Sequence, residues 1–387
     1  MAIDALRRAV ATPPVPSDAA GAERLALELL VGGYEGQTLP DSMARRLERG
    51  LTGVVLFARN FSKNDVGIDT EALLSHTAAI HAAAARQAST GGLPAVCAVD
   101  QEGGKVARLR APFTHLPPMR SLAGRDDPSL TERAGWQTGR ECLAAGFNVD
   151  FAPVLDIDTN PDNPIIADRA FGDTAEAVIR HAGAFLRGLQ RAGVVGCGKH
   201  FPGHGDTQVD SHLALPVLDF DLERLEAVEL RPFQALAGEL DLVMTAHILF
   251  RALDPKLPAT LSPEVLRPLL RGHCAFSGVV VSDDLEMRGV ADAFSPGDCV
   301  RLGLRAGVDL FLICRDEARL EEAQCAAAKI LRDGGEASAS ARAAIGRVRR
   351  LRSRLALPVA DRDALRCVLG DGPALGLREA LAVGTVL

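Results

Sequence analysis

The sequence predicts an α/β fold, a single (β/α)8 TIM-type barrel with an extra C-terminal helix. Three observations predict this fold. Short apolar runs alternate with longer helical patterns, which indicates βαβ units and a mainly parallel sheet. There are eight apolar runs, which is the number of strands in such a barrel. Most of the runs end in polar side chains, as in barrels that build their sites at the carboxyl ends of the strands.

The predicted strands are nearly continuous apolar runs, as expected when both faces of a parallel sheet are buried. They span residues 27–33, 53–57, 94–99, 148–155, 194–200, 242–247, 278–283 and 308–314. The helical patterns between them span residues 40–49, 70–87, 130–145, 174–192, 221–238, 263–271, 296–306 and 317–332. This order predicts strand–helix units in succession along the chain.

Polar side chains directly follow seven of the predicted strands. They are Arg59 and Asn60, Asp100, Asp156 and Asp158, Lys199 and His200, His247, Asp283, and Arg315. A doubly wound sheet, the alternative fold, usually carries a Gly-rich phosphate turn after its first strand and draws its site from few strands. The sequence has no such turn, so the pattern favours the barrel.

The barrel domain is expected to cover residues 23–358, between an N-terminal extension (1–22) and a weakly structured C-terminal tail (359–387). Residues 337–356 predict a basic amphipathic helix, in which Val348, Leu351 and Leu355 recur at helical spacing. Such a helix can contact a membrane or a nucleic acid. We expect instead that it packs across the barrel and turns its arginines to solvent.

Composition excludes several classes of protein. The 387 residues carry 43 Lys+Arg against 50 Asp+Glu, and only 4% are aromatic, which disfavours a nucleic-acid binder. The sequence contains no stretch of 18 or more apolar residues that would predict a membrane span, and its N-terminus lacks a signal-peptide pattern. The eight cysteines are scattered without a CxxC pair, as is typical of free thiols in a reducing compartment. We expect a cytoplasmic monomer.

The segment from residue 199 to 212, KHFPGHGDTQVDSH, is the densest group of reactive side chains. Its Pro and Gly residues predict a loop after a strand. One interpretation is a zinc site formed by His200, His204, Asp210 and His212, but the loop lacks the helix that would align such ligands. A second is a purely structural polar loop. The favoured interpretation is an acid–base pair, in which Asp210 orients His212 and raises its basicity.

Asp283 directly follows an apolar strand and should point into the mouth of the barrel, where a carboxylate can act as base, metal ligand or nucleophile. The alternative is a helix N-cap, for which Asp284 is the better candidate. Asp100 and Arg108 flank two glycines that let the backbone approach a ligand, and the pair can hold sugar hydroxyls. Arg169 is a candidate ligand clamp. A surface salt bridge would explain either arginine.

Six segments carry a family resemblance. They are GVVLFARNF (53–61), VDQEGGKVARL (99–109), ADRAFGD (167–173), KHFPGHGDTQVDSH (199–212), VMTAHI (243–248) and VVSDDLEM (280–287). In this order they resemble family 3 glycoside hydrolases of the bacterial β-N-acetylglucosaminidase type, the NagZ type. The KH-x-PGHG-x(4)-DSH motif separates this type from the family's β-glucosidases, whose acid/base is a Glu from a second domain. The family often has Arg at the position of Lys105.

The resemblance implies a retaining exo-β-N-acetylglucosaminidase without metal or cofactor. Asp283 matches the catalytic nucleophile, His212 the general acid/base and Asp210 its partner. The residues that match binding of the N-acetylglucosamine (GlcNAc) unit are Asp100, Arg108, Arg169, Lys199 and His200. The implied substrate is a small soluble GlcNAc-containing saccharide or muropeptide, with terminal β-linked GlcNAc on 1,6-anhydro-N-acetylmuramic acid, in peptidoglycan recycling.

Three alternatives stay open. A β-N-acetylglucosaminide phosphorylase fits the same scaffold, because a neutral histidine repels an incoming phosphate less than a carboxylate does. A non-catalytic sugar-binding protein is disfavoured by the joint presence of Asp210, His212 and Asp283, and a metal-dependent hydrolase is the last alternative. Residues 201–211 are expected to form a mobile lid. The scarcity of aromatic rings argues against a long polysaccharide cleft.

Overall fold

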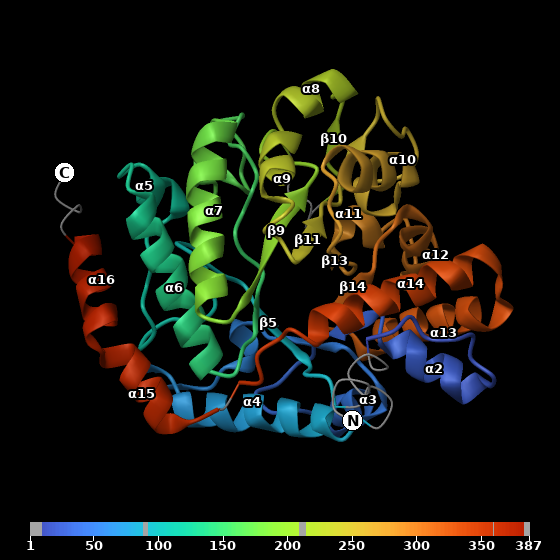
Figure 1. The fold of residues 1–387 in the computed structure, drawn as a ribbon, viewed down its shortest axis with the longest axis horizontal. Helices are drawn as coiled ribbons and strands as arrows, with labels where there is room; N and C mark the ends of the chain where they lie inside the picture. The colour runs from blue at the N-terminus through green and yellow to red at the C-terminus, as the bar shows by residue number, and fades with distance from the viewer. Residues whose placement is uncertain (1–9, 88–91, 209–213, 359, 383–387) are drawn as a thin grey trace.

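The computed structural model describes residues 10–87, 92–208, 214–358 and 360–382. Eight parallel strands close into a barrel, surrounded by helices (Figure 1), so the predicted fold class is confirmed. The strand order around the barrel is β1-β14-β13-β11-β9-β8-β5-β2. The strands are β1 (Leu30–Gly32), β2 (Gly53–Val55), β5 (Val96–Val99), β8 (Val149–Asp150), β9 (Val195–Phe201), β11 (Leu242–Thr245), β13 (Val279–Asp284) and β14 (Leu310–Ile313). Each of them overlaps a predicted strand.

The predicted helices also form, with two differences. The helices that overlap a single predicted segment are α3 (Asp41–Arg49), α4 (Thr70–Ala85), α6 (Pro128–Ala144), α7 (Ala175–Arg191), α12 (Pro296–Ala306) and α13 (Glu317–Asp333). The segment 221–238 divides into α8 (Leu222–Ala227) and α9 (Leu230–Leu236), because Pro232 has no N–H for a continuous helix. After α10 (Pro263–Val265), the chain widens into the π-helix η4 (Leu266–His273), which contains Pro268.

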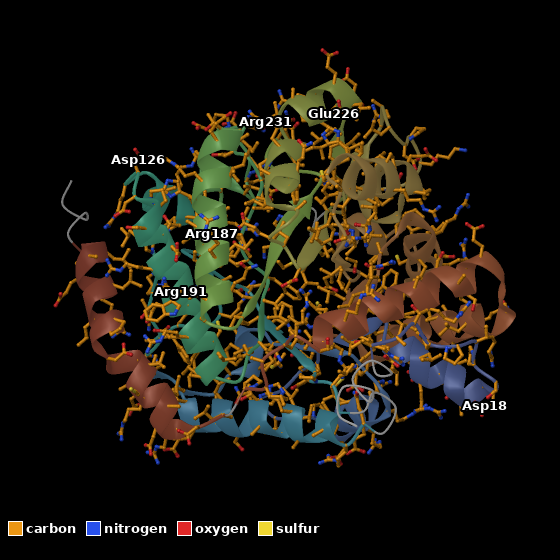
Figure 2. The ribbon with its side chains drawn as sticks, viewed as in Figure 1. Asp18, Asp126, Arg187, Arg191, Glu226 and Arg231 are labelled. Atoms are coloured by element: carbon orange, nitrogen blue, oxygen red, sulfur yellow. The ribbon has the colours of Figure 1, made fainter. Side chains whose placement is uncertain are left out.

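Charged side chains, among them Arg187, Arg191 and Arg231, lie on the outer faces of these helices (Figure 2). Arg187 on α7 lies 3.2 Å from Glu239, Arg191 on α7 lies 3.0 Å from Glu132, and Arg231 on α9 lies 2.6 Å from Glu176. Exposed pairs of this kind contribute at most about 1 kcal/mol each. The stability of the helical ring therefore comes from its packing against the strands.

Helix α14 (Gly335–Arg352) closes the amino-terminal end of the barrel. Val348, Leu351 and the following Leu355 pack into the same cluster as the inward-facing strand residues. This confirms that the basic amphipathic segment packs across the barrel. Its arginines, however, are not all turned to solvent. Arg349 forms a bidentate pair with Glu28, and Arg352 is fully buried and donates to the carbonyls of Leu93 and Pro94.

The C-terminal tail was expected to be weakly structured, but its described residues, 360–382, are mostly helical. It forms α15 (Arg362–Gly370) and α16 (Gly372–Ala382), which run beside α6 (Figure 1). Arg140 on α6 pairs with Asp371, and Arg125 donates to the carbonyl of Ala380 at 2.7 Å. Few apolar residues of the tail are buried, so the contacts come mainly from polar groups that no periodicity reveals.

At the other end, α2 (Ala19–Leu27) crosses the expected limit of the N-terminal extension at residue 22 and packs against α13. Along the described ranges, none of the helices combines the length and apolar character needed to cross a membrane.

The closure by α14 makes a stability prediction. Leu351 is 1% exposed at the base of the barrel, whereas Leu357, a few residues later, is 67% exposed. We expect Leu351→Ala to lower the free energy of unfolding by about 2–5 kcal/mol, because it leaves a cavity in the barrel interior. Leu357→Ala should change it by less than about 0.5 kcal/mol. Calorimetric melting of both variants checks this, and equal melting temperatures would refute the packing role of α14.

Candidate active site

A pocket opens at the carboxyl end of the barrel. Its lining comes from the ends of seven strands, β2, β5, β8, β9, β11, β13 and β14, and from the loops that follow them. The lining residues are Val55, Phe57, Asp100, Glu102, Val106, Arg108, Phe151, Ile165, Arg169, Lys199, His200, His204, Met244, Asp283, Asp284, Met287, Leu312 and Cys314. The cavity volume is about 180 Å³, small compared with the ~300–1,000 Å³ of pockets for drug-sized ligands. This size suits a single sugar ring.

Six of the eight predicted site residues border this one pocket. They are Asp100, Arg108, Arg169, Lys199, His200 and Asp283. The other two, Asp210 and His212, lie outside the described residues, so the predicted acid–base pair stays a prediction. The same holds for the predicted lid, whose last residues, 209–211, also lie there.

Asp283 faces the pocket because side chains alternate between the two faces of β13. Val279 and Val281 face the barrel interior, and Asp283 follows at the next two-residue step. Its Oδ1 accepts a hydrogen bond from the backbone N–H of Asp284 at 2.8 Å. Burial by itself raises the pKa of Asp283, but the nearby positive groups, His200 first, outweigh burial and lower it. The pocket thus holds an ionised carboxylate at neutral pH.

Asp284 does not cap a helix, so that prediction was wrong. Its Oδ1 accepts from the N–H of Glu286 at 3.0 Å and from the N–H of Cys314 at 3.3 Å, which ties the end of β13 to the end of β14. The next helix, α11 (Arg288–Ala291), starts after Met287. Burial, together with the charges of Glu286 and Asp283, raises the pKa of Asp284 to about 7.

A chain of alternating charges crosses the pocket wall. Lys199 Nζ donates to Asp100 Oδ1 at 2.9 Å and lies 2.6 Å from Glu102 Oε1. Arg169 donates to both oxygens of Glu102, at 2.8 and 2.9 Å. The Arg169 side chain is only 11% exposed, so this pair is not a surface salt bridge. It fixes the guanidinium at the pocket.

Arg108 is held more loosely. Its Nη2 lies 3.8 Å from Asp100 Oδ2, and the side chain is 30% exposed. Lys105 also points elsewhere, since it pairs with Asp168 at 3.5 Å on the surface. Asp100 and Arg108 therefore both keep polar groups that face the pocket and are available to a ligand.

The two glycines between Asp100 and Arg108 have a different role from the one expected. Gly103 and Gly104 take positive φ values of 112° and 53° in the turn between β6 (Gln101–Gly103) and β7 (Val106–Ala107). A Cβ on either would crowd the segment 116–119, and neither borders the pocket. They shape the hairpin that carries Glu102, rather than letting the backbone approach a ligand.

A second buried carboxylate orients His200. Asp156 accepts from His200 Nδ1 at 2.6 Å and from the backbone N–H of His200 and of His204, at 3.1 and 2.7 Å. Burial alone raises the pKa of Asp156, but the charge of His200 and these hydrogen bonds outweigh burial and lower it. The Nδ1 contact leaves His200 Nε2 facing Arg169 Nη2 at 3.5 Å. Asp156 thus sets the tautomer and the direction of the ring.

His204 is buried, and its Nδ1 is engaged with Thr207 Oγ1 at 2.7 Å. Burial lowers the pKa of His204 to about 4, so the ring is neutral at neutral pH. Within the part of the chain that the structure describes, no three His, Cys, Asp or Glu side chains are grouped to hold a metal ion. Asp210 and His212, which the disfavoured zinc interpretation also used, fall outside that part.

Other polar side chains after the strands brace the loops and do not reach the pocket. Asp158 pairs with Arg120 at 2.6 Å, His247 Nδ1 contacts Thr260 Oγ1 at 2.9 Å, and Arg59 donates to the Cys314 carbonyl. Two residues that shape the site were not predicted as site residues: Glu102, which borders the pocket, and Asp156, which orients His200. Only its position could have indicated Glu102 as a site residue, because it lies two residues after Asp100.

Comparisons with known proteins agree with this geometry. The model of the family described as "Glycosyl hydrolase family 3 N terminal domain" matches residues 42–351. A beta-hexosaminidase of Pseudomonas aeruginosa is 43% identical over 232 residues, which are 59% of this chain and 69% of that protein.

Two solved structures are similar over most of the chain. A glycoside hydrolase family 3 beta-N-acetylglucosaminidase from Paenibacillus sp. has a TM-score of 0.83 at 34% identity, and the match covers 93% of this chain and 68% of that one. NagZ from Neisseria gonorrhoeae, solved in complex with N-trifluoroacetyl-D-glucosamine, has a TM-score of 0.71 at 29% identity, with 92% and 97% covered.

Beneath the pocket, Asp150 is a buried carboxyl whose protonation predicts a pH effect. Its Oδ1 accepts from the N–H of Gln101 at 2.9 Å, while Oδ2 has no hydrogen-bond partner among the described residues. Burial raises the pKa of Asp150 to about 8. From about pH 4 to pH 8 the unfolded chain releases this proton and the folded chain keeps it, so rising pH destabilises the fold, by at most ~1.4 kcal/mol per pH unit.

We expect Asp150→Asn, which cannot titrate, to lack this destabilisation. The melting temperature of the variant minus that of the wild type should become more positive as the pH rises from about 4 to 8. Calorimetry across this range checks the slope, with Asp363→Asn on the exposed side of α15 as control. A difference that does not change with pH would mean that Asp150 is ionised in the folded protein.

Proposed function

The chain belongs to glycosyl hydrolase family 3 and is a glycoside hydrolase of the β-N-acetylhexosaminidase class. From this membership we propose that it is a retaining exo-β-N-acetylglucosaminidase. One observation carries the proposal. The ionised carboxylate of Asp283 borders a pocket of single-sugar size, together with the charged and polar side chains of Asp100, Arg108, Arg169, Lys199 and His200. An exo-acting enzyme needs such a small pocket, not an extended cleft.

The proposed reaction has two steps, as in other retaining glycosidases. In the first, an Asp283 carboxylate oxygen attacks the anomeric carbon of the bound GlcNAc. The glycosidic bond breaks, and the protonated His212 gives its proton to the departing oxygen. In the second, neutral His212 takes a proton from water, whose oxygen attacks the anomeric carbon and releases the Asp283 carboxylate. Asp210 would stabilise the imidazolium that gives its proton in the first step and forms again in the second.

The lowered pKa of Asp283 supports its part as nucleophile, because the attacking group must be ionised. A histidine suits the other part, because an imidazole with an ordinary pKa of about 6.5 can give and take a proton near neutral pH without deep burial. The pocket's donors and acceptors are charged, and charged groups make the stronger hydrogen bonds to sugar hydroxyls.

We propose a small, soluble substrate, a muropeptide that carries terminal β-linked GlcNAc on 1,6-anhydro-N-acetylmuramic acid, and a role in peptidoglycan recycling. The proposed location is the cytoplasm, where the enzyme would act as a monomer. The cysteines support this location, because all eight are free thiols and six of them are buried, as expected in a reducing compartment.

The reaction class is tested by product analysis with 4-nitrophenyl N-acetyl-β-D-glucosaminide in phosphate buffer containing EDTA. We expect the β-anomer of GlcNAc as the first product, seen by NMR before mutarotation, and Asp283→Ala to lower kcat/KM by about 10³-fold or more. Dominant GlcNAc-1-phosphate would establish phosphorolysis instead. Loss of activity with EDTA would favour the metal-dependent alternative, and an active Asp283→Ala variant would exclude Asp283 as nucleophile.

The role of His212 is tested by varying the leaving group. We expect His212→Ala to lose about 10²–10⁴-fold in kcat/KM on a disaccharide, whose leaving oxygen needs a proton. The loss should be at least about tenfold smaller on the 4-nitrophenyl glycoside, since nitrophenolate departs with little acid assistance. The two kcat/KM ratios to the wild type are the measurement. Equal losses on both substrates would argue against the acid role.

A further inference from the structure

We propose that Glu102 is the positioning residue of the pocket, which aims Arg169 and Lys199 at the sugar and holds Lys199 as a cation. This inference rests on the proposed function. Glu102 is not among the residues that the family resemblance assigns to sugar binding.

Glu102 lines the pocket, but its carboxylate is committed to protein partners. Its side chain is only 1% exposed, and both carboxylate oxygens are occupied. Oε1 lies 2.6 Å from Lys199 Nζ and accepts from Arg169 Nη2 at 2.8 Å, while Oε2 accepts from Arg169 Nε at 2.9 Å. The effect of Glu102 on a ligand therefore runs mainly through these two cations.

The same contacts determine the directions of both cations. Two donors of Arg169 are fixed in a bidentate pair, which leaves Nη2 beside His200 and Nη1 near the Ile165 carbonyl, at 3.5 and 3.3 Å. Lys199 is held between Glu102 and Asp100, so its flexible side chain has one direction. A lysine or arginine without such a partner would lose rotamer freedom on binding a sugar, at a cost in affinity.

Electrostatics give Glu102 its second effect. Burial lowers the pKa of Lys199, and Arg169 lowers it further, but Asp100 and Glu102 reverse this and raise it above the usual range. The charged and titratable groups that face Lys199 are Asp100, Glu102, Asp150, Arg169, Cys197 and Asp283. If Glu102 loses its charge, fewer anions oppose the effects of burial and of Arg169, both of which lower the pKa of Lys199. The pKa of Lys199 then falls.

Glu102→Gln tests both effects, because it keeps the shape of the side chain and removes the charge. On the 4-nitrophenyl glycoside we expect KM to rise by about tenfold or more at neutral pH, as two buried cations lose their partner. We also expect kcat/KM of the variant to fall by about another tenfold between pH 8 and 10.5, where Lys199 loses its proton and the wild type shows no such fall. Nitrophenolate departure needs little acid, so this range reports on binding.

Glu28→Gln is the matched control. Glu28 also forms a buried bidentate pair, with Arg349 at 2.7 Å for both contacts, and its side chain is likewise 1% exposed. The pair lies at the other end of the barrel, far from the pocket. We expect Glu28→Gln to lower the melting temperature as Glu102→Gln does, with the KM and pH profile of the wild type.

Glu102→Asp separates charge from reach. The variant keeps the negative charge but shortens the side chain by one methylene. It should therefore raise KM, while its kcat/KM should not show the additional fall between pH 8 and 10.5. A wild-type KM for Glu102→Asp, or a wild-type pH profile for Glu102→Gln, would overturn this inference. If Glu102→Gln fails to fold, the KM of Glu102→Asp still decides. A wild-type enzyme that does not cleave the glycoside would instead overturn the proposed function.

Discussion

The pairing of the first barrel strand with the last is the constraint on which the rest of the structure depends. Leu30 of β1 lies opposite Phe311 of β14, and the register continues to Gly32 and Ile313. A Cβ on the next residue, Gly33, would overlap the backbone of Cys314, so only glycine permits so close an approach. Once this pair closes the sheet, all strands present their carboxyl ends to one mouth. Residues from position 55 to 314 can then surround a pocket of single-sugar size.

Two buried carboxylates organise that pocket. Glu102 holds Arg169 and Lys199, and Asp156 holds the His200 ring and the backbone on either side of the turn to His204. Neither offers a free oxygen to a ligand. Their negative charges offset the charges of the buried cations. A pocket rich in ionised groups can therefore bind a sugar ring that carries no net charge. The groups that face the ligand are thus fixed before it arrives, which favours tight and selective binding.

The fold was predictable from the sequence because buried parallel strands leave continuous apolar runs, and these survive any detail of the loops. Helix breaks were harder, since the effects of Pro232 and Pro268 depend on local geometry that periodicity does not show. The helices α15 and α16 were missed because polar contacts to α6, such as Arg140 to Asp371, connect residues that are distant in sequence.

For the site, strand ends and motifs identified six side chains that border the pocket. They did not reveal which polar groups face inward and which brace loops. Glu102 and Arg169 are 67 positions apart, and no spacing rule predicts that they meet. Asp284 accepts a hydrogen bond from the N–H of Cys314 and so joins the ends of two neighbouring strands. From the sequence alone, an Asp at this position is equally compatible with a helix cap.

Closure by the last strand and by α14 also bears on how the chain is made. The edge of β1 has no partner until β14 leaves the ribosome, and the barrel base stays open until Leu351 and Leu355 follow. During synthesis a growing open sheet therefore exposes two unpaired edges, that of β1 and that of the strand made last, and an apolar interior for almost the whole length of the domain. Such surfaces invite aggregation in nascent chains, so chaperones that bind apolar segments would guard this protein until its final helices emerge.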